Sequence, residues 1–174
     1  MQPVKPFDPT AFLKVRDIAL WESELARFVS YPIIDDGQKL GYQSMRGIRA
    51  DLAGMLDDSG KEIEILKIFV TLGIRCVVPR SAVVATEQVV EASPDEEDET
   101  IVLYALESTF AVDYEVLQTM PEEQVSAFAQ FNSVHNVWPF WRHHVYDTLK
   151  RASLPVPEVP FFAGNQAKEA EAGT

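Results

Sequence analysis

Residues 137–155 read VWPFWRHHVYDTLKRASLP, and this stretch decides how the folded part of the chain ends. Pro139 has no backbone N–H and fits the first turn of a helix, whereas the pair Leu154-Pro155 favours an extended backbone. The stretch therefore predicts a helix that begins at Pro139 and ends after about four turns. Its apolar residues recur at three- and four-residue steps: Trp141, Val145, Leu149 and Ala152. Such a stripe is typical of a helix that packs on a sheet.

Four segments upstream have the apolar content that is typical of strands: 12–21, 40–56, 62–78 and 101–114. The sequence DDSG at residues 57–60 is a hairpin signal between the second and the third of them. Residues 22–30 are ambiguous, because their apolar residues have helical spacing. Any helix there is short, since Pro32 follows it.

The last two of these segments are apolar on both faces. A sheet that helices cover on one side normally has a polar outer face, so the second apolar face needs another subunit, a ligand or both. Residues 119–122, Thr-Met-Pro-Glu, look like a capping box that starts a first helix before the Pro139 helix. Strands that are followed by helices, without alternation, indicate an α+β fold with an antiparallel sheet.

Composition predicts one globular domain in the cytoplasm. The 174 residues, 47% of them hydrophobic, suffice for a single core, and no apolar run is long enough to cross a membrane. The N-terminal residues also lack the apolar core of a signal peptide. We expect residues 1–9 to be a disordered arm, residues 10–163 a single domain and residues 164–174 a disordered tail. The lone Cys76 is interpreted as a small buried hydrophobe.

The net charge of −12 argues against nucleic acid and anionic membranes as partners, because both require basic patches. The charge is also uneven. Within a predicted acidic loop, residues 80–99, the part from Ser81 to Glu99 holds seven acidic residues and neither Lys nor Arg. This segment is either a solvated, mobile loop or an acidic docking surface for a basic partner.

No set of residues predicts catalysis, a metal site or a cofactor. His143 and His144 are adjacent on the predicted helix and point about 100° apart, and no Cys or close carboxylate completes a ligand set with them or with His135. The sequence contains no phosphate-binding loop, serine nucleophile elbow or dinucleotide fingerprint. It therefore favours a binding protein over an enzyme.

Four large aromatic residues lie where the chain enters and leaves its last helix: Trp138, Phe140, Phe161 and Phe162. The last two end a proline-rich strip, residues 154–162, which must run extended. Core packing is one fate for such side chains. The other is to line a groove that accepts many sequences, because apolar burial is non-directional.

The stretch WPFWRHHVYDTLKRASLPVPEVPFF resembles the closing helix and tail of the bacterial export chaperone SecB family. The resemblance is clearest over residues 101–162 and extends to Asp17-Ile18-Ala19-Leu20-Trp21-Glu22, which is similar to the family's first strand. It implies a four-stranded antiparallel sheet with two C-terminal helices packed on one face, in a homotetramer built as a dimer of dimers. It also implies a holdase that binds unfolded precursor proteins without ATP and delivers them to the motor SecA.

The resemblance further implies which residues contact the motor. Asp17 and Glu22 stand on the first strand, with Glu22 one residue late, and Leu103 matches the apolar member on the last strand. Ala105 stands where the family has its last acid. Leu103-Tyr104-Ala105-Leu106 also resembles the last strand of SecB-like chaperones that protect a toxin–antitoxin pair by binding the antitoxin's unstructured tail. A third alternative is an assembly subunit whose apolar face is filled by partner subunits and which has no client groove.

Overall fold

The computed structural model describes residues 8–29, 39–80 and 100–162. Within them the chain forms a short 3-10 turn, four strands and a long helical region: η1 (Pro9–Ala11), β1 (Leu13–Arg27), β2 (Gly41–Leu56), β3 (Glu62–Pro79), β4 (Thr100–Val116), α1 (Glu122–Phe128), the π-helical segment η3 (Ala129–Ser133) and α2 (Val134–Arg151). Most of the predicted arm, nearly all of the predicted acidic loop and the predicted C-terminal tail lie outside the described residues.

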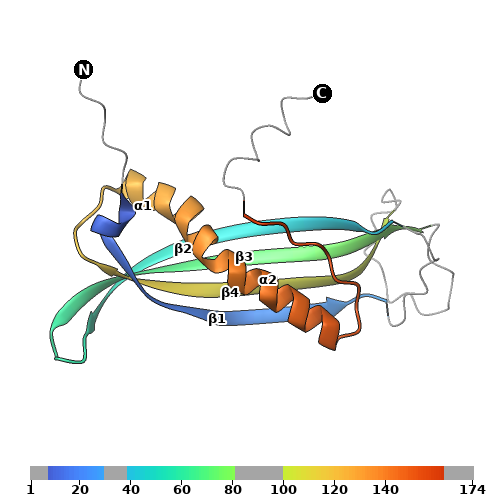
Figure 1. Cartoon of the computed structure of the whole chain (residues 1–174), viewed down its shortest axis with the longest axis horizontal. Coiled ribbons are helices and arrows are strands. Elements are labelled where there is room, and N and C mark those ends of the chain that lie inside the picture. Colours follow the sequence, from blue (N-terminus) through green and yellow to red (C-terminus); the bar gives the residue numbers. More distant parts are fainter. Residues whose placement is uncertain (1–7, 30–38, 81–99, 163–174) are drawn as a thin grey trace, which may run out of the picture. The chain divides into compact units, whose positions relative to one another are not determined.

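The four strands form one antiparallel sheet in the order β1-β4-β3-β2 (Figure 1). The predicted hairpin joins β2 to β3, and in its turn the Asp57 carboxylate accepts hydrogen bonds from the backbone N–H groups of Ser59 and Lys61, both at 2.9 Å. Gly60 has a φ of 80°, a conformation that favours glycine. The predicted α+β class with a four-stranded antiparallel sheet is therefore confirmed.

The short helix considered for residues 22–30 does not form, because β1 continues to Arg27. Here pairing with β4 prevails over local helical spacing. The backbone N–H of Phe28 donates to the carbonyl of Leu103 at 3.1 Å, and the Ser23 and Ser108 hydroxyls are hydrogen-bonded at 2.9 Å. A strand that can pair along its length satisfies more backbone groups than one isolated helical turn does.

The two predicted helices are present, but they follow one another directly and their boundaries differ from the prediction. The N-cap of α1 is Pro121, with no side-chain hydrogen bond, so the predicted capping box is wrong. The second helix begins at Val134 rather than at Pro139, which lies in the interior of α2. Residues at both ends of η3 keep right-handed helical backbone angles. Buried side chains on every turn, including Phe128, Val134 and Val137, stabilise this path despite the hydrogen bond that Pro139 removes.

The described chain forms two compact units, and every strand contributes to both. Unit 1 contains residues 1–21, 48–70 and 110–174, and therefore both helices. Its core includes three of the four residues of the predicted helix stripe: Trp141 is 3% exposed, and Val145 and Leu149 are fully buried, whereas Ala152 is half-buried. Aromatic packing joins β4 to the helical region, since the Tyr114 and Phe128 rings meet edge to face with centroids 5.0 Å apart.

Unit 2 contains residues 22–47 and 71–109. Its core includes Cys76 and Tyr104, both fully buried, so the interpretation of Cys76 as a small buried hydrophobe is confirmed. Burial is the main cause that raises the pKa of the Cys76 thiol. Burial likewise raises the pKa of the neighbouring Tyr42 to about 12. The thiol therefore stays protonated.

The second apolar face of β3 is covered in part by the chain itself. In unit 1, Phe69 is 7% exposed because the Trp21 ring packs edge-on at 5.3 Å and the Arg49 guanidinium lies 4.2 Å from the ring centroid. The uncovered apolar side chains of unit 1 lie instead on β1 and β2: Val15, Leu20, Trp21, Leu52, Met55 and Leu56. An additional subunit or ligand is therefore needed mainly to cover the exposed apolar side chains of β1 and β2, rather than those of β3.

Candidate functional site

An aromatic cluster lies between α2 and the segment that follows it. The Phe162 ring stands among three rings of the helical region, with centroids 5.6 Å from Phe131, 6.0 Å from His135 and 5.4 Å from Trp138. The spacing of the three helical residues is i, i+4 and i+7, which brings them to one side of a helix. We name the surface formed by Phe131, His135 and Trp138 the aromatic cleft, and the Phe162 ring lies against it.

Residues 155–162, which we name the C-terminal strap, run back along α2 in an extended conformation (Figure 1). Two side chains of α2 hold its backbone. The Trp138 indole Nε1–H donates to the Pro160 carbonyl at 2.7 Å, and the Arg142 Nε–H donates to the Val159 carbonyl at 2.9 Å. The Arg142 guanidinium also lies 4.3 Å from the Phe161 ring centroid, while Phe161 remains 82% exposed. The predicted extended exit from the helix is therefore confirmed.

Phe140 lies in a different place. Positions 138 and 140 point about 200° apart around a helix, so Phe140 cannot join the aromatic cleft. It lines a hollow of about 400 Å³ between α2 and the sheet of unit 1, together with Leu20, Phe110, Pro139, His143, His144 and Asp147. We name this the Phe140 hollow. Phe140 and Leu20 are about half exposed at its rim, at 47% and 48%.

One wall of the Phe140 hollow is a partly buried imidazole. His144 packs edge-on against Phe110 with ring centroids 6.2 Å apart. Burial lowers the pKa of His144, Asp147 opposes this effect, and the charges of His143 and Arg151 add to it. Since His144 is therefore neutral at physiological pH, the hollow presents a largely apolar wall with a polar edge.

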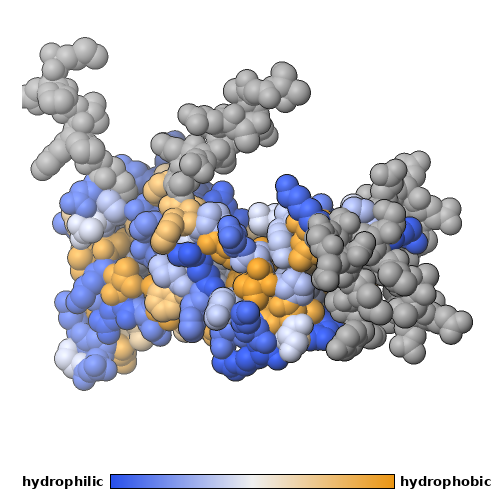
Figure 2. All heavy atoms as spheres, turned by 45° about the vertical axis from the view of Figure 1, so that its right-hand side comes forward, coloured by the Kyte–Doolittle hydropathy of each residue, from blue (hydrophilic) through white to orange (hydrophobic). Residues whose placement is uncertain are grey.

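The structure thus brings together three of the four predicted groove residues, Trp138, Phe161 and Phe162, and separates Phe140 from them. Two further exposed residues at these sites were not among the four predicted groove residues: Phe131, at 43% exposure, and Leu20, at 48%. For Phe131 the sequence does contain a signal, because a spacing of seven residues from Trp138 places both on one side of a helix. Figure 2 shows such apolar side chains as separate patches among polar residues. The binding role of all four predicted residues stays a prediction.

The residues implied in motor contact differ in accessibility. Asp17 is exposed, and its carboxylate accepts a hydrogen bond from the Ile18 backbone N–H at 2.9 Å. Glu22 is also exposed. Leu103, in contrast, is 1% exposed, so its side chain offers almost no surface to a partner. The role of these three residues stays a prediction.

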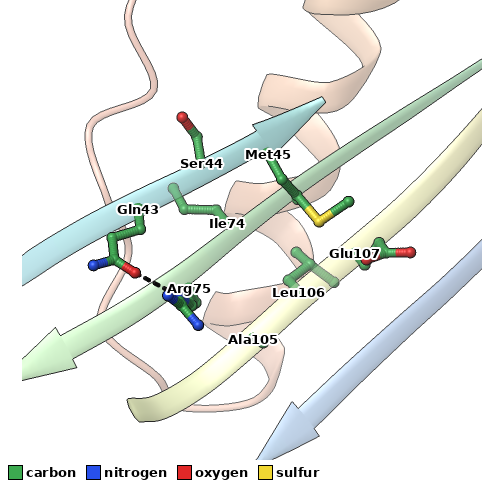
Figure 3. Close-up of a pocket in the computed structure, with 9 residues that line it drawn as sticks. Gln43, Ser44, Met45, Ile74, Arg75, Ala105, Leu106 and Glu107 are labelled. Atoms are coloured by element: carbon green, nitrogen blue, oxygen red, sulfur yellow. Dashed lines mark hydrogen bonds between the residues drawn. The ribbon is translucent and has the colours of Figure 1, made fainter. Parts of the chain in front are cut away.

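Ala105 lies in a second hollow, of about 390 Å³, on the sheet of unit 2 (Figure 3). Gly73 forms part of its floor and leaves room for Met45 to lie over β3, because an added Cβ would stand 2.5 Å from the Met45 Cγ. Arg75 donates a hydrogen bond from its Nε to the Gln43 side-chain oxygen at one wall. Glu107 is the acidic residue of this hollow.

Among residues 8–29, 39–80 and 100–162, no three His, Cys, Asp or Glu side chains gather as metal ligands. No helix in the same ranges is long and apolar enough to cross a membrane.

Comparison with known proteins identifies the fold. By sequence, the chain matches no protein-family model and no curated protein. By structure, it has the fold of a SecB-like chaperone. One similar protein is the SecB-like chaperone Rv1957 of Mycobacterium tuberculosis, solved in complex with a ChAD peptide from the antitoxin HigA1. The two chains are 18% identical with a TM-score of 0.59, and the match covers 88% of this chain and 93% of that chain.

Proposed function

We propose that the protein is a cytoplasmic, ATP-independent holdase chaperone that binds unfolded proteins through apolar surface and has no enzymatic activity. The observation that carries this proposal is the group of exposed aromatic side chains around α2, above all Phe140 at 47% and Phe161 at 82% exposure, on a SecB-like fold. Exposed apolar patches of this kind are typical of sites that bind other chains. Its burial is non-directional, so segments of many sequences can bind.

An aggregation assay tests this proposal. A chemically denatured, slow-folding protein is diluted into buffer without nucleotide, and light scattering is followed with and without the chaperone. Suppression at about one tetramer per client supports a holdase. If scattering is unchanged while the chain still assembles, the alternative of an assembly subunit without a client site is the better one.

We expect a homotetramer in solution. Large apolar side chains of β1 and β2 remain exposed in the single chain, Leu52 at 61% and Leu56 at 66% among them, and partner subunits would bury them. Mass photometry or light scattering at micromolar concentration should give four times the 19.5 kDa of one chain. A monomer at that concentration would contradict the expected assembly.

Two destinations for the client are compatible with a holdase, delivery to SecA and protection of an antitoxin. Asp17 and Glu22 support the first, since both carboxylates are exposed. Two observations favour the second: Leu103 is buried and Ala105 carries no charge, and the similar mycobacterial chaperone binds an antitoxin peptide. Binding of purified SecA with the Asp17→Ala and Ala105→Glu variants tests the first. If both variants leave SecA binding unchanged, delivery to SecA is not the role.

A further inference from the structure

We infer that the aromatic cleft is a binding site for an extended peptide with an aromatic residue after a proline or another apolar residue, and that the C-terminal strap is its intramolecular occupant. A client segment of this chemistry binds by displacing the strap. The statement that the peptide belongs to a client rests on the proposed holdase function, whereas the peptide site itself does not.

The contacts of the strap are those of a bound peptide. α2 donates to two main-chain carbonyls, of Val159 and Pro160, which any peptide possesses. Main-chain bonds of this kind give affinity without selecting a sequence. Specificity comes from one set of side-chain contacts, in which the Phe162 ring meets Phe131, His135 and Trp138.

The form of the occupant is also informative. Prolines at positions 155, 157 and 160 hold the strap extended, which lowers the entropy lost when it lies in the cleft. The Phe162 ring lies among the rings of the cleft, whereas the neighbouring Phe161 points out at 82% exposure. Consecutive side chains of an extended peptide point to opposite sides, so only one of these two rings enters the site.

An occupant on the same chain competes strongly with a free peptide. Short tethers give effective concentrations of about 1 mM, so a micromolar ligand meets a cleft that is filled almost all the time. The apparent dissociation constant is the intrinsic value divided by the fraction of open cleft, and a cleft open for about 1% of the time binds about 100-fold more weakly. Loosening the strap should therefore tighten peptide binding.

The test uses the full chain and a fluorescein-labelled peptide PVPEVPFF, the sequence of residues 155–162, followed by fluorescence anisotropy. We expect Phe162→Ser to bind this probe at least about tenfold more tightly than the unaltered chain, because the strap loses its anchor while the cleft is kept. The Glu158→Ser variant is the matched control, since Glu158 is an exposed residue of the same strap outside the ring contacts of Phe162, and it should bind like the unaltered chain. The peptide PVPEVPFS lacks the ring that corresponds to Phe162, so it should bind neither Phe162→Ser nor the control variant.

Three outcomes would overturn the inference. They are equal probe affinity of Phe162→Ser and the unaltered chain, equal tightening by Glu158→Ser, and equal binding of PVPEVPFF and PVPEVPFS. Circular dichroism and elution volume show that each variant is folded, and Phe162→Leu, with a smaller loss of packing, should give an intermediate affinity. If the peptide test contradicts the inference about the cleft, the aggregation assay still tests the holdase function independently. A chain that binds the probe but suppresses no aggregation would refute the holdase function and leave the inference about the cleft standing.

Discussion

Replacing Trp141 with alanine is expected to lower the free energy of unfolding by about 3–5 kcal/mol. Trp141 is 3% exposed on the buried stripe of α2 that also contains Val145 and Leu149. Truncation removes a large ring from a close-packed interior and leaves a cavity that rigid neighbours fill only in part. Urea denaturation followed by circular dichroism measures the change, at one fixed protomer concentration because assembly adds to apparent stability.

Tyr146→Ala provides the control on the same helix. The Tyr146 ring is 56% exposed, and the Lys150 ammonium lies 5.8 Å from its centroid. A surface truncation of this kind typically changes stability by no more than about 0.5 kcal/mol. Equal losses for Trp141→Ala and Tyr146→Ala would mean that the two sides of α2 are not buried and exposed as described.

The strands were predictable because their signal is local. The 62–78 prediction corresponds to β3, Glu62–Pro79, and the 40–56 prediction to β2, Gly41–Leu56. Alternating apolar residues fix the strand period, and Asp57 and Gly60 supply the turn chemistry that ends one strand and starts the next. Sheet class follows from such patterns without knowledge of long-range contacts.

The errors occurred where tertiary contacts prevail over local preference. Helical spacing in residues 22–30 carried no information about the β4 edge that pairs with them. Pro139 looked like a helix start, because a proline in a helix interior removes a hydrogen bond and clashes with the preceding turn. The buried side chains of Val134 and Val137 on the turns before it stabilise the helix there. Burial of this kind cannot be read from the stretch alone.

In the candidate site, too, local sequence signals were informative and tertiary contacts were not predictable. Aromatic content marked Trp138, Phe161 and Phe162 as unusual, and they do lie together. The hydrogen bond from Trp138 to the Pro160 carbonyl joins residues 22 positions apart, and no sequence rule predicts it. Phe140 was grouped with them by proximity in sequence, although the helical period places it on another side. Position along the helix, rather than distance along the chain, therefore decides which aromatic residues share a site.

Phe140→Ser is expected to weaken capture of an unfolded client by about tenfold to a hundredfold, while the chain keeps its fold and assembly. Burial of an aromatic side chain contributes about 1.5–3 kcal/mol, and each 1.4 kcal/mol corresponds to a factor of ten in Kd. Phe140 and Leu20 stand half exposed at the rim of an apolar hollow of about 400 Å³, so a client side chain that enters it buries both. Anisotropy of a labelled, permanently unfolded client measures the affinity.

The control for this prediction is Leu117→Ser. Leu117 is 49% exposed in the same unit, close to the 47% of Phe140, but it does not line the Phe140 hollow. If exposed apolar area alone drove capture, the two serine variants would weaken binding by factors in proportion to the area removed. If the hollow is the site, Leu117→Ser stays within about twofold of the unaltered chain, because a scattered surface contact contributes little to binding. A loss at Leu117 as large as that at Phe140 would remove the hollow from the client-binding surface and leave the aromatic cleft as its remaining candidate.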